Sequence, residues 1–320
     1  MTSKNIAEEA EGLDIESLVR EYLTFCEKQK KLSAATMKGY RIDLCQFLEL
    51  QSNGGPILSK ETLNRFCRAL NEKYMPRTVK RKMASVHAFC RWLEFEEVID
   101  SDPFRKVNTK IQQIKQIPQY LPLASMEQIL NTAYRRQREA DRRKPAYKVS
   151  VQNVAVLELL FATGIRVSEL CALRRENYQT HPGAIRVLGK GNKERIIPLE
   201  NREVIMALEK HIALYSDLIE NQGYLFYNQR KMPLSQQSVR NMVSKYARES
   251  GIPGKTTPHV IRHTFATLML EQEVDIRYIQ TLLGHSSIRT TEIYTTVSCT
   301  KERQIMATKH PRNLLTLFAG

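Results

Sequence analysis

The run from Val154 to Phe161 constrains the fold of this chain more than any other stretch. It is apolar at every position except Glu158, and Gly164 follows it closely. A helix that is apolar all round has to be buried, and glycine commonly ends a helix in the left-handed conformation. The sequence therefore predicts a buried helix that ends at Gly164 and places Arg166 just beyond its C-terminal end.

The chain divides at a polar stretch from Val107 to Pro122, which is rich in Gln and Lys and bracketed by prolines. This composition is typical of an interdomain linker, and 320 residues that are 42% hydrophobic suffice for two cores. The predicted division is a flexible N-terminus (1–12), a first domain (13–106), the linker (107–122), a second domain (123–312) and a C-terminal tail (313–320).

The first predicted domain is a small helical bundle. Four segments between Leu18 and Leu93 carry apolar residues at helical spacing, and two basic clusters lie among them, the second from Arg77 to Lys82. We interpret these clusters as contacts to DNA phosphates, with an ordinary solvated helix face as the alternative. The candidate contact residues are Lys38, Arg41, Arg77, Lys80 and Arg81.

The second predicted domain is helical with one small β-hairpin, so the fold class is mainly α with an α+β second domain. Ser125–Gln128 has the pattern of a capping box and predicts the start of a helix. The basic stretch Arg135–Lys148 that follows is either a loop or an extension of that helix. Alternation with a period of two over 184–199 predicts the hairpin, whose Gly-rich tip carries Lys190.

Two further helical patterns follow the hairpin, at 202–220 and 236–250. The second of these is polar and basic on one side, and we interpret it as a helix that faces DNA through Arg240 and Lys245. Further on, Pro258 suits the first turn of another helix.

The net charge of the chain indicates a polyanionic partner. Lys and Arg number 49 against 34 Asp and Glu, which gives +15 and a pI near 9.6. A merely basic soluble protein is the alternative. The six cysteines show no metal-binding spacing, no apolar run has transmembrane length, and the first residues are acidic instead of signal-like. We therefore expect a cytoplasmic, nucleoid-associated protein with reduced thiols and no membrane contact.

Several polar residues of the second domain suit chemistry on a phosphodiester. Charge accumulates on the non-bridging oxygens of a pentacoordinate phosphorus, and two guanidinium groups can replace a metal ion there. Arg166 and Arg262 are the predicted pair, Glu169 could orient Arg166, and a third donor would be His259 or His285. A structural ion pair between Arg166 and Glu169 is the alternative.

Tyr294 is the candidate nucleophile, because the surrounding cations could stabilise its phenolate, and Lys190 could protonate the departing 5′ oxygen. An interfacial tyrosine and a solvated turn lysine are the alternatives for these two residues. His259 and His263 have the i, i+4 spacing of metal ligands, but no Glu follows the first His as in a zinc-protease helix and no third ligand is suitably spaced. We therefore expect neither a metal nor a cofactor, with His263 in a packing or supporting role.

These motifs, taken in order, resemble the signature boxes of the tyrosine recombinase (phage integrase) family, and most closely those of its Xer-like branch. The matching segments are Thr163–Leu170, Gly189–Arg195, His259–His263, Leu283–His285 and Tyr294, and in addition Ser33–Leu48 looks like the opening of the family's SAM-like core-binding domain and His310–Arg312 like its closing motif. The resemblance covers nearly the whole chain.

The resemblance implies a catalytic cradle and its chemistry. The cradle is Arg166, Lys190, His259, Arg262 and His285, supported by Glu169, and Tyr294 forms a 3′-phosphotyrosyl link without metal or ATP. A homotetramer on two double-stranded DNA sites would exchange strands through a Holliday junction, with the tail docked on a neighbour or on its own domain. A second recombinase or a DNA-bending protein is a further possible partner.

Two other functions remain open on these residues. A type IB topoisomerase would share the phosphotyrosine chemistry, and a DNA-binding regulator would share only the affinity for DNA. The stretch Arg135–Lys148 looks longer and more basic than its counterpart in chromosome-dimer resolving relatives, which favours a mobile-element integrase or an inversion enzyme.

Overall fold

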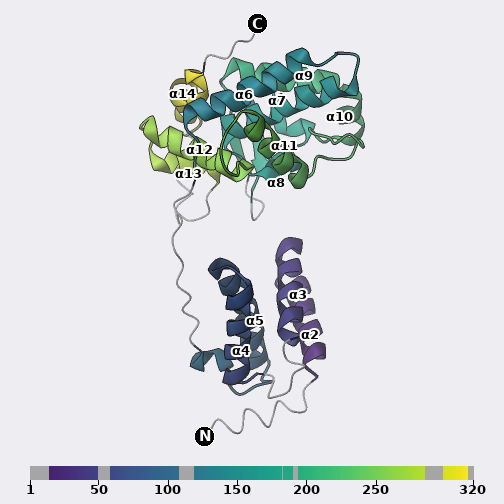
Figure 1. Ribbon diagram of the computed structural model, residues 1–320, viewed down its shortest axis with the longest axis vertical. Coiled ribbons are helices and arrows are strands. Elements are labelled where there is room, and N and C mark those ends of the chain that lie inside the picture. The colour runs from purple at the N-terminus through teal and green to yellow at the C-terminus, as the bar shows by residue number, and fades with distance from the viewer. Residues whose placement is uncertain are drawn as a thin grey trace. The chain divides into compact units, whose positions relative to one another are not determined.

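The computed structural model describes residues 14–49, 58–107, 119–181, 183–189, 194–284 and 298–315 of the chain. It divides into two units, Met1–Gln116 and Ile117–Gly320, which are described separately below. Both units are mainly helical, and the described strands all belong to one small sheet in the second unit, which confirms the predicted fold class (Figure 1). No described helix is long and apolar enough to cross a membrane.

The first unit is the predicted helical bundle. Its described elements are α2 (Ile15–Lys28), α3 (Ala34–Glu49), α4 (Lys60–Lys73), α5 (Pro76–Phe95) and the short 3₁₀ helix η2 (Pro103–Lys106). Asp14 and Ser59 cap α2 and α4 through their side chains, and Pro76 occupies the first turn of α5. Aromatic side chains fill the core, where the ring of Tyr22 lies 5.4 Å from those of Phe89 and Trp92.

One of the basic residues predicted to lie on the surface of this bundle, Lys82, is buried in its interior. Asp43 on α3 is fully buried, and its carboxylate accepts hydrogen bonds from Arg81, from Lys82 at 2.9 Å and from Ser85 at 2.8 Å. The Lys82 side chain is only 4% exposed, so its predicted place in a phosphate-contacting cluster is wrong. A buried carboxylate has to be paired, and the neighbouring lysine serves that need.

The second unit is assembled around the apolar helix that the sequence indicates. Its described elements are α6 (Leu123–Glu139), α7 (Pro145–Thr163), α8 (Val167–Ala172), η3 (Arg175–Asn177), β1 (Tyr178–Gln179), β2 (Ala184–Leu188), β3 (Glu194–Pro198), α9 (Arg202–Leu214), α10 (Ser216–Gln222), α11 (Gln236–Glu249), α12 (Pro258–Glu271), α13 (Ile276–Leu283), α14 (Ser298–Lys309) and η4 (Pro311–Leu314). Every residue of α7 from Val154 to Thr163 is buried, and α6, α9 and α12 pack against the helix (Figure 1).

Glu158 is the charged residue inside this apolar helix, and the C-terminal part of the chain neutralises it. Arg312 in η4 donates two hydrogen bonds of 2.8 Å to its carboxylate, and the hydroxyl of Tyr134 donates a third at 2.8 Å. Both members of the ion pair are at most 1% exposed. The charge of Glu158 on Arg312 outweighs the effect of burial and raises the pKa of that guanidinium.

His310 ties the same segment to the end of α7. Its Nδ1 accepts from the backbone N–H of Arg312 at 2.8 Å, and its Nε2 lies 2.9 Å from the carbonyl oxygen of Ala162. A carbonyl oxygen can only accept, so Nε2 carries the proton and the ring is neutral. Burial lowers the pKa of His310 to about 4, in agreement with this assignment.

The sheet is antiparallel, in the order β1-β2-β3. Ile185 pairs with Ile197 and Val187 with Arg195, which confirms the predicted hairpin. The tip of the hairpin, residues 190–193, lies outside the described residues.

Two local predictions differ from the structure. Helix α6 begins at Leu123 with Pro122 at its N-cap, so the predicted start at the Ser125–Gln128 capping box is wrong. Pro122 is still extended, with a ψ of 151°, and the helix begins at the next residue. The pattern at 202–220 is two helices, because the backbone turns at Tyr215 between α9 and α10. The stretch Arg135–Lys148 is helical up to Glu139, and a loop then leads to α7 at Pro145.

Candidate active site

Arg166 lies at the N-cap of α8, directly after the end of α7. Gly164 ends α7 with a φ of +57°, and a Cβ at this position would lie 2.6 Å from the ring of Phe265. Glycine is therefore required by both conformation and space. The Arg166 guanidinium donates to Glu169 Oε1 at 2.9 Å and to the carbonyl oxygen of Gly284 at 3.0 Å. Its side chain is 38% exposed, so one part of it faces solvent.

Arg262 reaches the same place from α12. Pro258 occupies the first turn of this helix and Thr257 caps it, as the sequence predicts for the proline. The guanidinium donates to the carbonyl oxygens of Gly164 at 2.8 Å and Leu283 at 2.7 Å. Burial, together with the charge of Arg166, lowers the pKa of Arg262 to about 10. The group remains cationic at neutral pH, and the structure brings the two predicted arginines together at the end of α13.

His259 and His263 lie one turn apart on the first half of α12, and their Nε2 atoms are 3.1 Å apart. One ring therefore donates to the other. Burial, the proximity of His259 and the charge of Arg262 lower the pKa of His263, which favours its neutral form. His259 is exposed, and His263 lies beside it as a supporting residue. In the described part of the chain, no group of three or more metal-ligating side chains forms.

Arg195 is a residue of this site to which the sequence analysis assigned no role. From β3 it donates to both carboxylate oxygens of Glu169, at 3.0 and 2.8 Å, and to the carbonyl oxygen of Leu282 at 2.8 Å. Burial raises the pKa of Glu169, but the hydrogen bonds from Arg195 and Arg166 outweigh it, so the pKa lies below its usual value. The alternation of the strand could have pointed to Arg195 in the sequence. Arg195 lies two residues before the buried Ile197, so both side chains are on the same, inward face of the strand.

Three of the predicted catalytic residues, Lys190, His285 and Tyr294, lie outside the described residues. The chain is described up to their nearest flanks. Gly189 follows β2, Gly284 ends α13 with a φ of +64°, and α14 begins at Ser298.

The candidate DNA-contacting residues are exposed in both units. Lys38, Arg77 and Lys80 project from α3 and α5, and Arg240 and Lys245 project from α11. Arg41 is 3.6 Å from Glu27, and Arg240 donates to Gln236 at 3.0 Å. Arg81 is half-exposed, but it forms an ion pair with the buried Asp43. Asp43 therefore partly neutralises the positive charge that Arg81 could offer to a phosphate.

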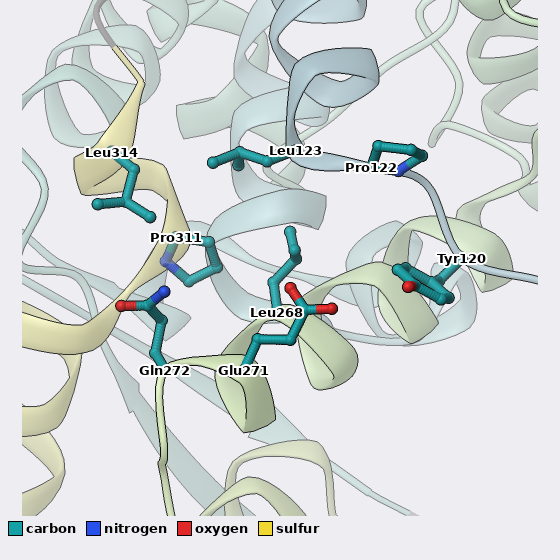
Figure 2. A pocket seen from close by; sticks show the side chains of 8 residues that line it. All are labelled: Tyr120, Pro122, Leu123, Leu268, Glu271, Gln272, Pro311 and Leu314. Atoms are coloured by element: carbon teal, nitrogen blue, oxygen red, sulfur yellow. The ribbon is translucent and has the colours of Figure 1, made fainter.

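A cavity in the second unit lies away from Arg166 and Arg262. It has a volume of about 260 Å³ and is formed by Tyr120–Leu123, by the last turn of α12 and by η4 (Figure 2). Glu271 on its wall follows Arg262 by nine residues, roughly 13 Å along the helix axis. Figure 2 shows that the apolar side chains of Leu123, Leu268 and Leu314 line it. The cavity is therefore not the phosphate site.

Comparison with known proteins identifies the class. The family model described as "Phage integrase family" matches residues 120–301, and the one described as "Phage integrase, N-terminal SAM-like domain" matches residues 19–97. The chain therefore belongs to the phage integrase family. The similar proteins are named tyrosine recombinase and tyrosine recombinase XerD, and tyrosine recombinases are enzymes.

A tyrosine recombinase from Agathobacter rectalis is 40% identical over 300 residues, which cover 93% of this chain and 98% of the relative. Tyrosine recombinase XerD from Halalkalibacterium halodurans is 34% identical over 304 residues, covering 92% and 97%. The solved structure of XerH site-specific recombinase bound to palindromic difH substrate, a post-cleavage complex, matches with a TM-score of 0.68. At 21% identity over 89% of this chain and 83% of that one, this last match is a likeness of fold.

Proposed function

We propose that the protein is a site-specific recombinase that cleaves and rejoins double-stranded DNA through a 3′-phosphotyrosyl intermediate, without metal or ATP. The observation that carries this proposal is the meeting of Arg166 and Arg262 at the end of α13, directly before His285. Within the proposal, 13–106 is a core-binding domain, 107–122 a linker and 123–312 the catalytic domain.

The proposed reaction is a transesterification at phosphorus. The phenol of Tyr294 gives its proton to a basic group of the site, and its oxygen forms a bond to phosphorus. The bond to the 5′ oxygen breaks as Lys190 gives that oxygen a proton. Arg166 and Arg262 neutralise the charge that develops on the non-bridging oxygens, with His259 and His285 as further donors. Attack by a 5′ hydroxyl on the phosphotyrosine reverses the step, so no external energy source is required.

Tyr294→Phe should abolish covalent attachment to DNA, because the nucleophilic oxygen is removed while the cationic site remains. Trapping on a nicked suicide duplex, followed by denaturing electrophoresis, measures the attachment, and a binding assay should show nearly unchanged affinity. Tyr120→Phe is the matched control, since Tyr120 is an exposed tyrosine on the wall of the distant cavity. A covalent complex that persists in Tyr294→Phe would contradict the proposal.

Strand exchange separates this proposal from its alternatives. A recombinase exchanges strands between two cognate duplexes, whereas a type IB topoisomerase would only relax supercoils. A regulator would bind DNA and form no covalent complex at all. Products joined from two labelled duplexes therefore identify the first activity.

We further propose that the exposed cations of α3, α5 and α11 hold DNA through its phosphates. DNA affinity should then fall steeply with salt, with a logarithmic slope of about −0.9 for each phosphate neutralised. Lys80→Gln should make this slope shallower by about one unit, measured by titration at several salt concentrations. Lys82→Gln is the contrasting variant. The ammonium of Lys82 is buried and donates to Asp43, so its removal should leave the salt slope unchanged. A flat salt dependence of the unmodified protein would refute the proposed phosphate contacts.

The assembly that fits this reaction is a homotetramer on two DNA sites, which exchanges strands through a Holliday junction. A second recombinase or a DNA-bending protein would act with it in the cytoplasm, at the nucleoid. Within the tail 313–320, Asn313 accepts a hydrogen bond from Asn201 of its own unit at 3.0 Å and Leu315 is buried in that unit's core. The residues after Leu315 are proposed to dock on a neighbouring protomer. Deletion of 316–320 in the two-duplex assay tests the tail, because cleavage that continues without exchange is the expected pattern.

A further inference from the structure

Three successive backbone carbonyls close the end of α13, and each accepts a hydrogen bond from a different arginine. Leu282 accepts from Arg195 at 2.8 Å, Leu283 from Arg262 at 2.7 Å and Gly284 from Arg166 at 3.0 Å. The last carbonyls of a helix have no partner within it and carry partial negative charge. Guanidinium groups satisfy these carbonyls and, in the same contact, fix where the helix ends.

Two of these arginines belong to the proposed phosphate site, and Arg195 does not. All three of its nitrogens donate to protein acceptors, one to Leu282 and two to the carboxylate of Glu169. The side chain is 11% exposed. Arg195 therefore acts on its neighbours, and a direct contact with a phosphate is not its role.

Glu169 carries the effect of Arg195 to Arg166. Its Oε2 accepts from the backbone N–H of Arg166 at 2.8 Å, and its Oε1 accepts from the Arg166 guanidinium at 2.9 Å. The same two oxygens are held by Arg195. A single carboxylate thus connects β3, the N-cap of α8 and, through Arg195, the end of α13.

The guanidinium of Arg195 packs closely against Gly284 at the end of α13. A Cβ added at Gly284 would lie 3.0 Å from Arg195 Nη1 and 3.2 Å from its Cζ, and the backbone there has a φ of +64°. The guanidinium therefore lies against the residue that precedes His285, on the face that a side chain would occupy.

We propose that Arg195 is a positioning residue, which sets the end of α13, up to Gly284, against Arg166. The inference rests on the proposed function for its catalytic consequence. These contacts require a planar group whose donors point in several directions. A single lysine nitrogen cannot reach both carboxylate oxygens of Glu169 and the carbonyl oxygen of Leu282. Arg195→Lys should therefore fail nearly as badly as Arg195→Gln.

The first test separates cleavage from binding. Single-turnover cleavage of a nicked duplex at saturating DNA should be about 100-fold slower in both Arg195 variants, the loss expected for a site displaced by about 1 Å. The dissociation constant for DNA should change little. Cleavage rates are compared per folded protein, because the loss of contacts to the buried Glu169 also lowers the midpoint of thermal unfolding. Arg186→Gln is the matched control, because Arg186 is exposed on the outward face of β2, opposite Ile196. Wild-type cleavage rates in Arg195→Lys would overturn the proposal, as would loss of cleavage only in proportion to loss of folded protein.

The second test needs no catalysis. Amide hydrogen exchange in the last turn of α13 should be faster in Arg195→Gln than in the wild type, and unchanged in Arg186→Gln. If the wild type cleaves no duplex but the exchange difference is present, the proposed function fails and the positioning contact stands. Unchanged exchange would overturn the positioning contact.

Gly284→Ala adds an independent variant at the same contact. It should slow cleavage alone, and its combination with Arg195→Gln should be less harmful than the product of the two single effects, because both changes disturb one interaction. Multiplicative effects would contradict the inference.

Discussion

Arg262→Ala should slow DNA strand cleavage by about 10³-fold, which is the upper range for the loss of one preorganised donor to a developing oxyanion. Arg262 is 5% exposed, and its guanidinium donates to the carbonyl oxygens of Gly164 and Leu283. Its removal takes away a fixed positive charge and also releases the ends of α7 and α13 from each other. Single-turnover cleavage of the nicked duplex, at saturating DNA, measures the effect.

Arg277→Ala is the control for charge alone. Arg277 lies at the start of α13, is 76% exposed and pairs with Asp275 on the surface. Its loss should change the cleavage rate by less than about threefold, because exposed pairs contribute little. Arg262→Ala protein that is folded, binds DNA and cleaves within tenfold of the wild type would remove Arg262 from the proposed site.

Arg312→Met should lower the free energy of unfolding of the second unit by about 3–5 kcal/mol, the usual cost of leaving one member of a buried ion pair alone. Glu158 would keep only the hydroxyl of Tyr134 as a partner, inside a helix that is buried all round. Urea unfolding followed by circular dichroism measures the change. Combination with Glu158→Leu should restore much of the loss, since the stranded carboxylate is then gone.

Arg136→Met provides the comparison on the surface of the same unit. Arg136 pairs with Glu249 at 2.6 Å, but its side chain is 42% exposed. Its replacement should cost less than about 1 kcal/mol. Equal losses for Arg136→Met and Arg312→Met would mean that the Glu158–Arg312 pair is not a significant anchor of the C-terminal segment.

The parts of this fold that the sequence predicts well are those determined by neighbours along the chain. The buried helix up to Gly164, the hairpin and the helix at Pro258 each depend on local periodicity or on one residue with a restricted backbone. The site follows from motifs, and the structure brings Arg166 and Arg262 together at one helix end. The start of α6 was misplaced because Pro122 and the Ser125 pattern offer competing local signals.

The parts that escaped prediction depend on residues far apart in the chain. Glu158 looks like an isolated interruption of an apolar run, and its partner Arg312 lies 154 residues further on. Lys82 looks like one member of a basic run until Asp43, 39 residues earlier, turns out to be buried against it. Arg195 is separated from Leu282 by 87 residues. The periodicity of a sequence does not predict such long-range pairs. A charged residue at a position that should be buried indicates only that it has a partner somewhere in the chain.

The acceptors at the end of α13 are main-chain oxygens, and this affects which changes the site can tolerate over evolution. A side chain at position 282 or 283 can be exchanged for another apolar one without altering the atom that each arginine grips. Variation can therefore accumulate along this helix while the cationic cluster keeps its shape. Insertion or deletion of one residue between Ile276 and Gly284 would instead rotate all three oxygens away at once, so length is under stricter selection here than composition.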